Sequence, residues 1–529
     1  MEYISRVLME EEEEEDDDRF EQPALMEAQE SLARIMGASS SCSSVDKSWS
    51  DMVNMSFLMG TVEARKLLPS TDNIPSGDVD GVRLIQRSRK GGNELMETSS
   101  RASKVMATAV PEEEEVGLQE MVKRMMLNDC EVSREEMEDL RAAMKDGDGF
   151  RCVRRPSRSK VLQVVDLRTL LIRCAEKVKD DDRRGARELL AHITHHAFPT
   201  GDATQRLAHC FAAALEARLA GSAASAVVSI QKRRWPAAAT MMASSDPGSA
   251  VKFLEAYRLF AATCCFKKVA YMFANMTICR AAEGKRRLHI VDYGVSFGFQ
   301  WAGLLRMLAA RDGGPPAVTI TGIDLPQPGF RPARYIEETG RQLTACAREL
   351  GVPSFKFHAI AAANWDAVRL EIDIDDDPEE TVVAVNSVFR LEALVDDSVV
   401  VDRPSPRDVS LFYYSAIFDV LDATMPRTSP HRRVLERDVL APFALNIVAC
   451  EGRDRTDRFE SYRQWQLRMQ RAGLTQLPLD PDDVAAVRDM VKKQRYHRDF
   501  VLDEDRHWLL QGWKGRILYA SSTWVARHP

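Results

Sequence analysis

Hydrophobic residues recur with a helical period over residues 166–283. The first segment places apolar residues at i, i+3, i+4, i+7, i+8 and i+11: Leu167, Leu170, Leu171, Cys174, Ala175 and Val178. Asp166 precedes this stripe, where a carboxylate caps a helix N-terminus. The spacing returns in Ala186–Ile193 and Leu207–Leu215, and Val251–Met276 extends it. The pattern therefore predicts an all-helical block.

The first of these segments also contains a docking motif. Leu167, Leu170 and Leu171 spell LxxLL, with which a helix binds in the groove of a partner. The alternative is that they form the buried face of the first helix. The alternative is favoured, because the same residues continue the apolar stripe.

After Gly284, short apolar runs alternate with amphipathic segments. The runs predict strands at Leu288–Val291, Ala317–Ile323, Phe355–Ile360, Thr381–Val385, Leu445–Cys450 and Ile517–Ala520. The amphipathic segments predict helices at Trp301–Ala310, Pro332–Leu350 and Phe459–Ala472. Such alternation indicates an α/β fold, with a mostly parallel, Rossmann-type sheet over residues 284–529 and helices on both faces. The helical block is then an added cap subdomain.

Residues 1–160 differ from the rest of the chain. They contain the acidic runs Glu10–Asp18 and Glu112–Glu115, and their apolar residues are scattered, so we expect a disordered acidic arm. Three short segments with helical spacing are the expected exceptions: Ala24–Met36, Met52–Pro69 and Val116–Met144. Acidic residues beside bulky apolar ones are typical of activation segments, whereas a solubilising tail is the alternative, and composition does not separate the two.

A basic stretch joins this arm to the helical block. Its cations are Arg151, Arg154, Arg155, Arg158 and Lys160. A cluster of this kind in an exposed linker is typical of a nuclear-import signal. A solvated linker without a function is the alternative.

The charge, the lengths of the apolar runs and the cysteine spacing argue against several classes of function. The chain has 529 residues and a net charge of −8, which argues against a uniformly basic nucleic-acid-binding surface. We see neither a secretory pattern nor a run of the ~20 apolar residues that span a bilayer, so no membrane partner is expected. The 10 cysteines form no CxxC pair, which favours reduced thiols and argues against a zinc site. A histidine cluster lacks the further ligands of a metal site: His192, His195 and His196.

The turn after the first predicted strand carries the pattern of a cofactor site. Asp292 ends the strand, and Gly294 and Gly298 allow the backbone to approach a ligand before the next helix begins. Asp324 ends the second strand, where an acid commonly accepts hydrogen bonds from a ribose. Together these residues resemble the S-adenosylmethionine site of Rossmann-type methyltransferases.

The same turn also argues against a retained enzyme. Aromatic residues crowd it: Tyr293, Phe297, Phe299 and Trp301. We therefore expect a vestigial pocket without cofactor or catalytic residues, in which Asp292 serves as a structural acid. The rival hypothesis is an S-adenosylmethionine-dependent enzyme. Neither a GxSxG elbow nor a GxxxxGK[ST] loop is present.

These residues resemble a known family, the GRAS proteins. Leu288, His289, Ile290, Val291 and Asp292 are similar to its VHIID motif, and Asp166–Gly221 to its first leucine-rich region. Asn446–Gly452 resembles part of its PFYRE region. Its SAW region resembles a C-terminal segment marked by Trp508, Gly512, Trp513 and Trp524. Together the motifs cover residues 166–529, and Ser56–Pro69 resembles an N-terminal motif of one scarecrow-like branch.

The resemblance implies a plant nuclear transcription regulator or co-regulator. It implies dimers with itself or other GRAS proteins, and contacts with DNA-binding transcription factors. Direct DNA binding stays open: Lys285, Arg286 and Arg287 are candidate phosphate contacts, and a solvated face is the alternative. An inactive isoform that titrates partners is a further alternative.

One segment departs from the family pattern. Pro406–Asp408 is followed almost at once by Leu411–Asp419, whereas relatives place several dozen residues between these signatures. The missing unit includes a strand that would be central in the sheet, beside the fourth strand. We expect the final strands to close the gap, or the chain to be less stable than full-length relatives, because unpaired buried backbone groups are costly. A faulty gene model is the third explanation.

Overall fold

The computed structural model describes residues 112–148, 165–221, 247–391, 406–450 and 460–526, apart from residue 129 and short gaps between residues 328 and 379, together with residue 455. The predictions for the first 111 residues, and for Arg151, Arg154, Arg155, Arg158 and Lys160, lie outside the described residues.

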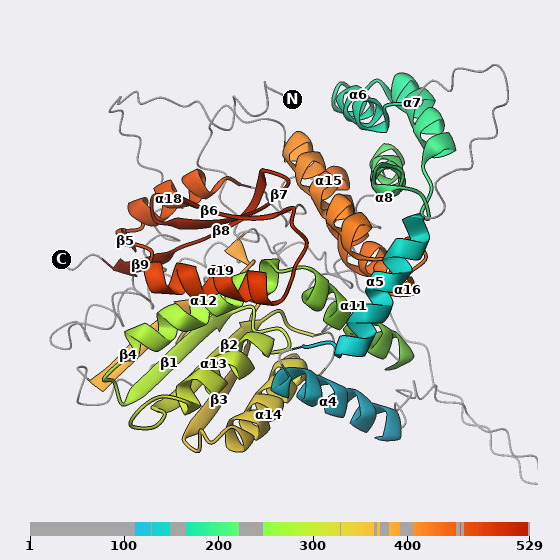
Figure 1. Ribbon diagram of the computed structural model, residues 1–529. Helices are drawn as coiled ribbons and strands as arrows, with labels where there is room; N and C mark the ends of the chain where they lie inside the picture. The colour runs from blue at the N-terminus through green and yellow to red at the C-terminus, as the bar shows by residue number, and fades with distance from the viewer. Residues whose placement is uncertain are drawn as a thin grey trace, which may run out of the picture. The chain divides into compact units, whose positions relative to one another are not determined.

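A parallel sheet forms from the first four predicted strands (Figure 1). Its order is β3-β2-β1-β4, and its strands are β1 Arg287–Tyr293, β2 Ala317–Asp324, β3 Phe355–Ala361 and β4 Thr381–Asn386. On one face, Leu288 and Ile290 of β1 join a large core that includes residues of α13 and α14. On the other face, Val291 and Tyr293 pack with Trp365. This alternation confirms the predicted Rossmann-type sheet.

Three helices of the α/β part lie close to their predicted bounds: α13 Phe299–Ala309, α14 Arg334–Glu349 and α18 Tyr462–Arg471. The sequence pattern did not predict α19 Pro481–Lys493, and α12 Phe266–Ala281 ends the region predicted as the helical block. A capping box at Ser461 begins α18, because its hydroxyl accepts from the backbone of Gln464 at 3.3 Å.

The C-terminal strands form two antiparallel sheets, so the expectation of a mostly parallel sheet is wrong for this part. One is β5–β9 and the other β6–β7–β8, with the bounds β5 Leu474–Leu477, β6 Phe500–Asp505, β7 Trp508–Trp513, β8 Arg516–Ser521 and β9 Thr523–Ala526. Lys514 and Gly515 join β7 to β8 with φ angles of 49° and 78°, as a tight hairpin turn requires.

These strands do not close the expected gap beside β4. In the part of the chain that the structure describes, β4 pairs with β1 alone, and neither antiparallel sheet pairs with it. The fourth strand is also less buried than the first: five of its six residues are partly exposed. The sheet therefore ends at β4 within the described residues.

The helical block forms as predicted, and Asp166 caps its first helix by accepting from the backbone nitrogen of Arg168 at 3.1 Å. Its helices are α6 Leu167–Lys179, α7 Arg183–His196, α8 Ala203–Leu219 and α11 Pro247–Thr263. Two later helices complete the core of α6–α8, namely α15 Pro406–Thr424 and α17 Ala441–Ala449. The expected division at residue 283 is therefore crossed, because Phe418 and Ile447 are buried among α6–α8. Between them lie α16 Pro430–Leu435 and the π-helix η4 Glu436–Leu440.

The strand predicted at Leu445–Cys450 is wrong, because these residues continue α17 and pack against α8. A short apolar run fits a buried helix as well as a buried strand. The helix contacts α8 and α15, and its buried residues share a hydrophobic core with them.

The helical segment predicted at Val116–Met144, inside the acidic arm, is confirmed. Residues 112–148 form α4 Glu112–Leu127 and α5 Arg134–Asp148. Buried residues of α4 belong to the same core as β1 and α13. The two helices therefore cover the expected exception Val116–Met144 and extend it by four residues at each end. Among the described helices none is long and apolar enough to cross a membrane.

Candidate functional site at the carboxyl end of the parallel sheet

The turn between β1 and α13 has backbone conformations that only particular residues adopt easily. Gly294 has a φ of 104° and Gly298 a φ of 73°, in the region that favours glycine. A side chain at Gly294 would overlap that of Arg390, and one at Gly298 would press on Thr339 and Leu343 of α14. The two glycines therefore allow protein side chains, rather than a ligand, to approach the turn.

Asp292 and Asp324 lie at the ends of neighbouring strands, as the sequence predicts. Asp292 is opposite Gly322 in the pairing of β1 with β2, and Asp324 is the last residue of β2. Both carboxylates are almost completely buried, with exposed fractions of 3% and 2%.

Protein donors hold the Asp292 carboxylate. The Trp301 indole donates to Oδ2 at 2.7 Å, and the Asn386 amide donates to Oδ1 at 2.7 Å. Asn386 also contacts the Gln300 amide, which contacts that of Asn275. Asp292 thus ends a buried network that ties β1 and β4 to α12 and α13.

Asp324 is held in a similar way by other groups. It accepts hydrogen bonds from the backbone nitrogens of Ser296 and Leu325 at 3.1 and 2.8 Å. The Arg390 guanidinium donates to its two oxygens at 3.2 and 3.3 Å. The Arg390 side chain is only 10% exposed, so it closes the position at which a ribose would meet Asp324.

Burial dominates the electrostatics of this site. It raises the pKa of Asp292 to about 6, although the hydrogen bonds from Asn386 and Trp301 act in the opposite direction. Burial, followed by the nearby charge of Arg390, lowers the pKa of Lys267 to about 8. The Lys267 ammonium lies 4.5 Å from the centre of the Tyr257 ring, which partly replaces its lost hydration.

The aromatic residues of the turn pack together, as the sequence indicates. Phe297 stacks on Phe299 with 5.3 Å between ring centres, and Tyr335 meets Phe297 edge-on at 5.9 Å. Trp301 is completely buried. The residues therefore do not fit S-adenosylmethionine, because its expected carboxylate acceptors already bind Trp301, Asn386 and Arg390.

The remaining residues of the VHIID-like motif are structural. Leu288, Ile290 and Val291 are buried on the two faces of β1. The His289 ring lies 2.9 Å from the Thr321 hydroxyl on β2, which pairs two buried polar groups.

The predicted docking leucines belong to the core. Leu167 and Leu171 are only 4% and 2% exposed, and Leu170 packs partly buried against the same cluster. The favoured alternative, a buried helix face, is therefore the one observed. A partner cannot reach Leu167 and Leu171 while the block is folded.

The residues of the SAW-like motif build the C-terminal sheets. Trp513 is completely buried, and its indole donates to Asp419 of α15 at 2.7 Å. Trp508 and Trp524 meet edge-on at 6.2 Å between ring centres. Gly512 is needed because a side chain there would press on the backbone oxygen of Arg516. The motif therefore anchors the β6–β7–β8 sheet to a helix.

Sequence reasoning missed Arg390 and the amide network. Asn386 carried a usable signal, because it ends the fourth predicted strand and so lies at the same edge of a parallel sheet as Asp292. The sequence contained no such signal for Arg390, because this residue follows β4 in a short irregular segment. Among the described residues, no group of three or more histidine, cysteine or acidic residues is arranged to hold a metal ion. The His196 ring contacts the rings of His192 and His195.

These features define a class: a Rossmann-type α/β domain with a helical cap, whose cofactor position is filled by the protein's own side chains. Residues 167–411 and 408–525 match the GRAS domain family. The chain belongs to this family.

Relatives and a solved structure agree with this assignment. Scarecrow-like protein 9 of Arabidopsis thaliana is 43% identical over 395 residues, 68% of this chain but 52% of that protein. Scarecrow-like protein 34 of the same plant is 37% identical over 521 residues, 89% of this chain and 80% of that protein. The crystal structure of SCL7 from Oryza sativa superposes with a TM-score of 0.53 at 26% identity and covers 68% of this chain and 99% of that one. Family membership supports a role as a plant transcription regulator.

Proposed function

We propose that this chain regulates transcription in the plant nucleus through protein–protein contacts, with its Rossmann-type domain serving as a scaffold rather than as an enzyme. One observation carries the proposal. The two strand-end carboxylates, which an active cofactor site would offer to its ligand, bind Trp301, Asn386 and Arg390 instead. The partners we propose are other GRAS chains, in homo- or heterodimers, and DNA-binding transcription factors.

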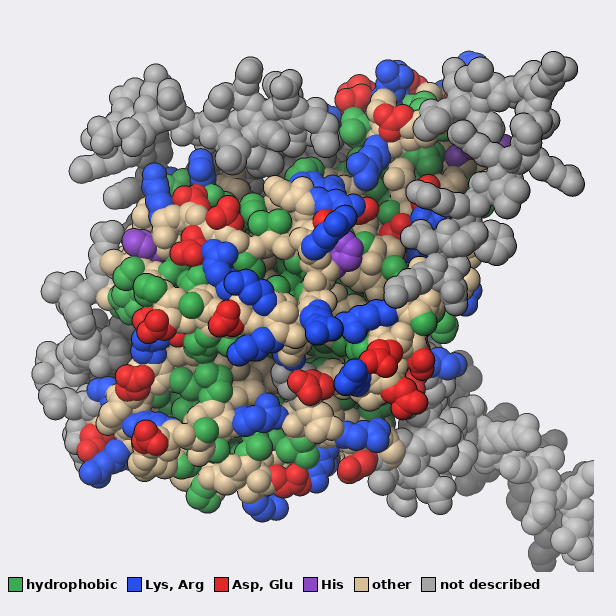
Figure 2. All heavy atoms as spheres, viewed as in Figure 1, with side chains coloured by type: hydrophobic (Ala, Val, Ile, Leu, Met, Phe, Trp, Pro, Cys, Tyr) green, Lys and Arg blue, Asp and Glu red, His purple; other side chains and the backbone are tan. Residues whose placement is uncertain are grey.

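The surface supports protein partners more than a nucleic-acid backbone. On the face that Figure 2 shows, basic and acidic side chains are interspersed. Arg286, one of the candidate phosphate contacts, already pairs with Glu380 at 3.2 Å. Direct binding to DNA phosphates would weaken steeply as salt rises. An affinity for DNA that stays constant between low and moderate salt rejects such contacts.

Titration calorimetry with S-adenosylmethionine tests the non-enzymatic role. We expect no binding heat from the purified full chain. Micromolar binding that Asp292→Ala abolishes would overturn the proposal and restore the methyltransferase hypothesis. The Asp182→Ala variant is the control, because this carboxylate caps α7 in the helical block and is not part of the turn between β1 and α13.

Regulatory activity is tested in plant cells. A reporter assay that compares the tethered arm, residues 1–111, with the whole chain distinguishes an activator from an isoform that only titrates partners. A pull-down from plant nuclei identifies the partners. Replacing the five cations Arg151, Arg154, Arg155, Arg158 and Lys160 with alanine is expected to reduce nuclear accumulation, and unchanged accumulation would reject the import signal.

A further inference from the structure

The segment α4–α5 lies outside the family's matched residues, which begin at residue 167. Its first helix is nevertheless part of the main core. Leu118, Val122, Met125 and Met126 are 1–5% exposed and follow the spacing i, i+4, i+7, i+8. This is the arrangement by which an amphipathic helix lies in a hydrophobic groove. The helix contacts α11, α13 and α14 of the folded domain, and Figure 1 shows it beside α14.

Polar contacts hold the C-terminal half of α4. The Arg306 side chain of α13 donates to the backbone oxygen of Leu127 at 2.7 Å and so satisfies a terminal carbonyl of the helix. One turn earlier, Lys123 pairs with Glu349 of α14 at 2.5 Å. The surface on which α4 lies thus buries its apolar side chains and places the cation Arg306 at its C-terminus.

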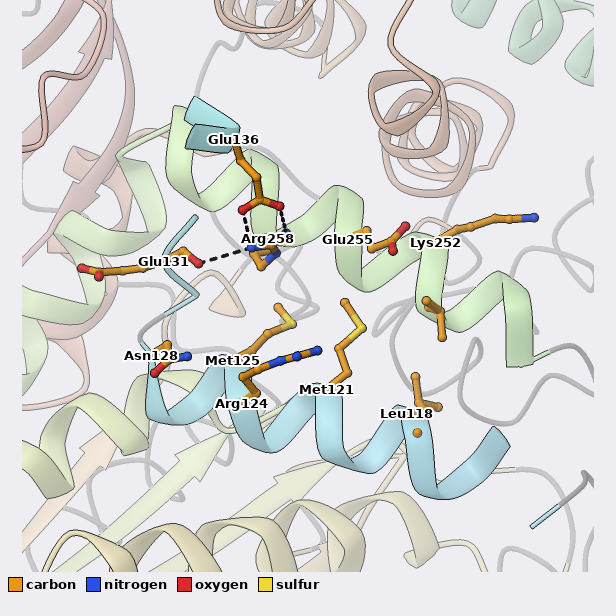
Figure 3. A pocket seen from close by; sticks show the side chains of 12 residues that line it. Leu118, Met121, Arg124, Met125, Asn128, Glu131, Glu136, Lys252, Glu255 and Arg258 are labelled. Atoms are coloured by element: carbon orange, nitrogen blue, oxygen red, sulfur yellow. Dashed lines mark hydrogen bonds and ion pairs between the residues drawn. The ribbon is translucent and has the colours of Figure 1, made fainter. Parts of the chain in front are cut away.

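A second contact fixes α5 to α11. The Arg258 guanidinium donates to the two oxygens of Glu136 at 2.7 and 3.1 Å and to the backbone oxygen of Glu131 at 3.5 Å (Figure 3). The hydrogen bond from Arg258 lowers the pKa of Glu136 to about 2, so the carboxylate is charged at neutral pH. This bidentate pair is a strong ionic contact, and it joins α5 to α11 of the folded domain.

A partly open cavity lies between α4 and α11, although the two helices also contact each other. The cavity has a volume of about 880 Å³ and is lined by Leu118, Met121 and Met125 of α4 and by Val251 and Arg258 of α11. In Figure 3 the methionines of α4 extend toward α11 across this space. The two helices therefore contact each other but leave a partly open cavity between them. Unbranched methionine side chains adapt to several packing partners, which suits a contact that can be exchanged.

We propose that α4 is an internal ligand that occupies a helix-docking face of the domain, formed by α11, α13 and α14. The face takes a partner helix with the same chemistry: leucine, valine or methionine at i, i+4, i+7 and i+8, with its C-terminus at Arg306. Because α4 belongs to the same chain as the face, its effective concentration there is on the order of millimolar, and a free helix competes poorly. Release of α5 from Arg258 opens the face.

A binding experiment on the full chain tests this proposal. The probe is a fluorescein-labelled peptide of residues 110–131, and its anisotropy is measured with the wild type and with Glu136→Arg. The substitution places two guanidinium groups together and weakens the contact between α5 and α11. We expect the variant to bind the peptide at least tenfold more tightly than the wild type. The double variant Glu136→Arg with Arg258→Glu restores an opposite-charge pair and is expected to bind as weakly as the wild type.

Matched controls keep the result interpretable. Arg134→Ala removes an exposed pair with Glu138 on the same helix and is expected to leave peptide binding unchanged. A peptide with Val122→Asp and Met125→Asp is expected not to bind. Equal peptide affinity in wild type and Glu136→Arg, with both shown to be folded by circular dichroism, overturns the proposal.

Hydrogen exchange on the wild type covers the case in which Glu136→Arg unfolds. An exchangeable helix opens without the domain, so amides of residues 118–127 should exchange at least tenfold faster than those of α13. Exchange of α4 only together with α13 overturns the proposal. The proposed docking face is a feature of the folded domain and does not depend on the role in transcription. The peptide-binding and exchange tests can therefore fail while the regulatory role is supported, and the reverse also holds.

Discussion

The Trp301 indole donates a 2.7 Å hydrogen bond to the Asp292 carboxylate, and the two residues are 0% and 3% exposed. In a Rossmann-type cofactor site, the turn that follows the first strand meets the ligand. Here the acid beside that turn binds the first turn of α13 instead. Asp292, an acid at the position of a cofactor site, thus joins β1 to α13 through Trp301.

Replacing Trp301 with phenylalanine removes a donor from a buried carboxylate and leaves a small cavity. We expect the free energy of unfolding to fall by about 2–4 kcal/mol, from the lost hydrogen bond and the lost packing. Urea denaturation measures the change. Trp524→Phe is the control, because its indole bonds to Ser522 in a partly exposed strand, and we expect it to cost about 1 kcal/mol or less. Equal losses would contradict a special role for the Trp301 contact.

Asp292 should make stability depend on pH in an unusual direction. Its pKa is about 6 in the folded protein and 3.8 as a free group, so between these values the folded state binds a proton that the unfolded state releases. This group therefore stabilises the fold as pH falls from 7 to 5, by about 1 kcal/mol. Asp292→Asn cannot titrate. The stability difference between wild type and variant should shift by that amount between pH 7 and pH 5, and parallel curves would contradict the raised pKa.

Gly294 should tolerate substitution less well than a glycine of similar conformation elsewhere. Gly294→Ala and Gly351→Ala both place a side chain at positive φ, at 104° and 81°. The alanine at 351 meets no neighbour, whereas that at 294 overlaps Arg390 and separates it from Asp324. We expect Gly294→Ala to cost about 2 kcal/mol more. Thermal unfolding compares them, and equal costs would show that Arg390 moves freely.

Arg206 joins the helical block to later parts of the chain. Its side chain is 1% exposed and bonds to Asp422 at 2.8 Å and Glu436 at 2.9 Å. Arg206→Met leaves these acids without their main donor, and we expect a loss of about 3–5 kcal/mol. Arg184→Ala removes an exposed pair with Glu188 and should cost at most about 0.5 kcal/mol. Chemical denaturation followed by tryptophan fluorescence provides both values, and a small loss at Arg206 would contradict its role as an anchor.

The short parallel sheet should lower the stability of the whole domain. Within the described residues β4 pairs on one side only, and the later strands form separate sheets. We expect a melting temperature below that of relatives that contain the additional central strand. Differential scanning calorimetry of the purified chain measures it. A single cooperative transition above ~60 °C would contradict this expectation.

Local patterns in the sequence determined the elements and the site's carboxylates. The helical stripe after Asp166 and the alternating strands and helices are set by side-chain periodicity, which a single chain displays directly. Asp292 and Asp324 were found because acids that end parallel strands must lie at one edge of the sheet. The family motifs confirmed that order. Short apolar runs remained ambiguous, which is why Leu445–Cys450 was expected as a strand and forms a helix.

Only the tertiary structure decided what the carboxylates face and where distant segments pack. Arg390 reaches Asp324 across 66 positions, and Asn386 reaches Asp292 across 94, so neither contact follows from local spacing. The position of α4 on α13 and α14 is decided in the same way, because its apolar stripe specifies a helix with a buried face but not its partner. Burial and hydrogen bonding depend on which surfaces meet, and that is a property of the folded chain.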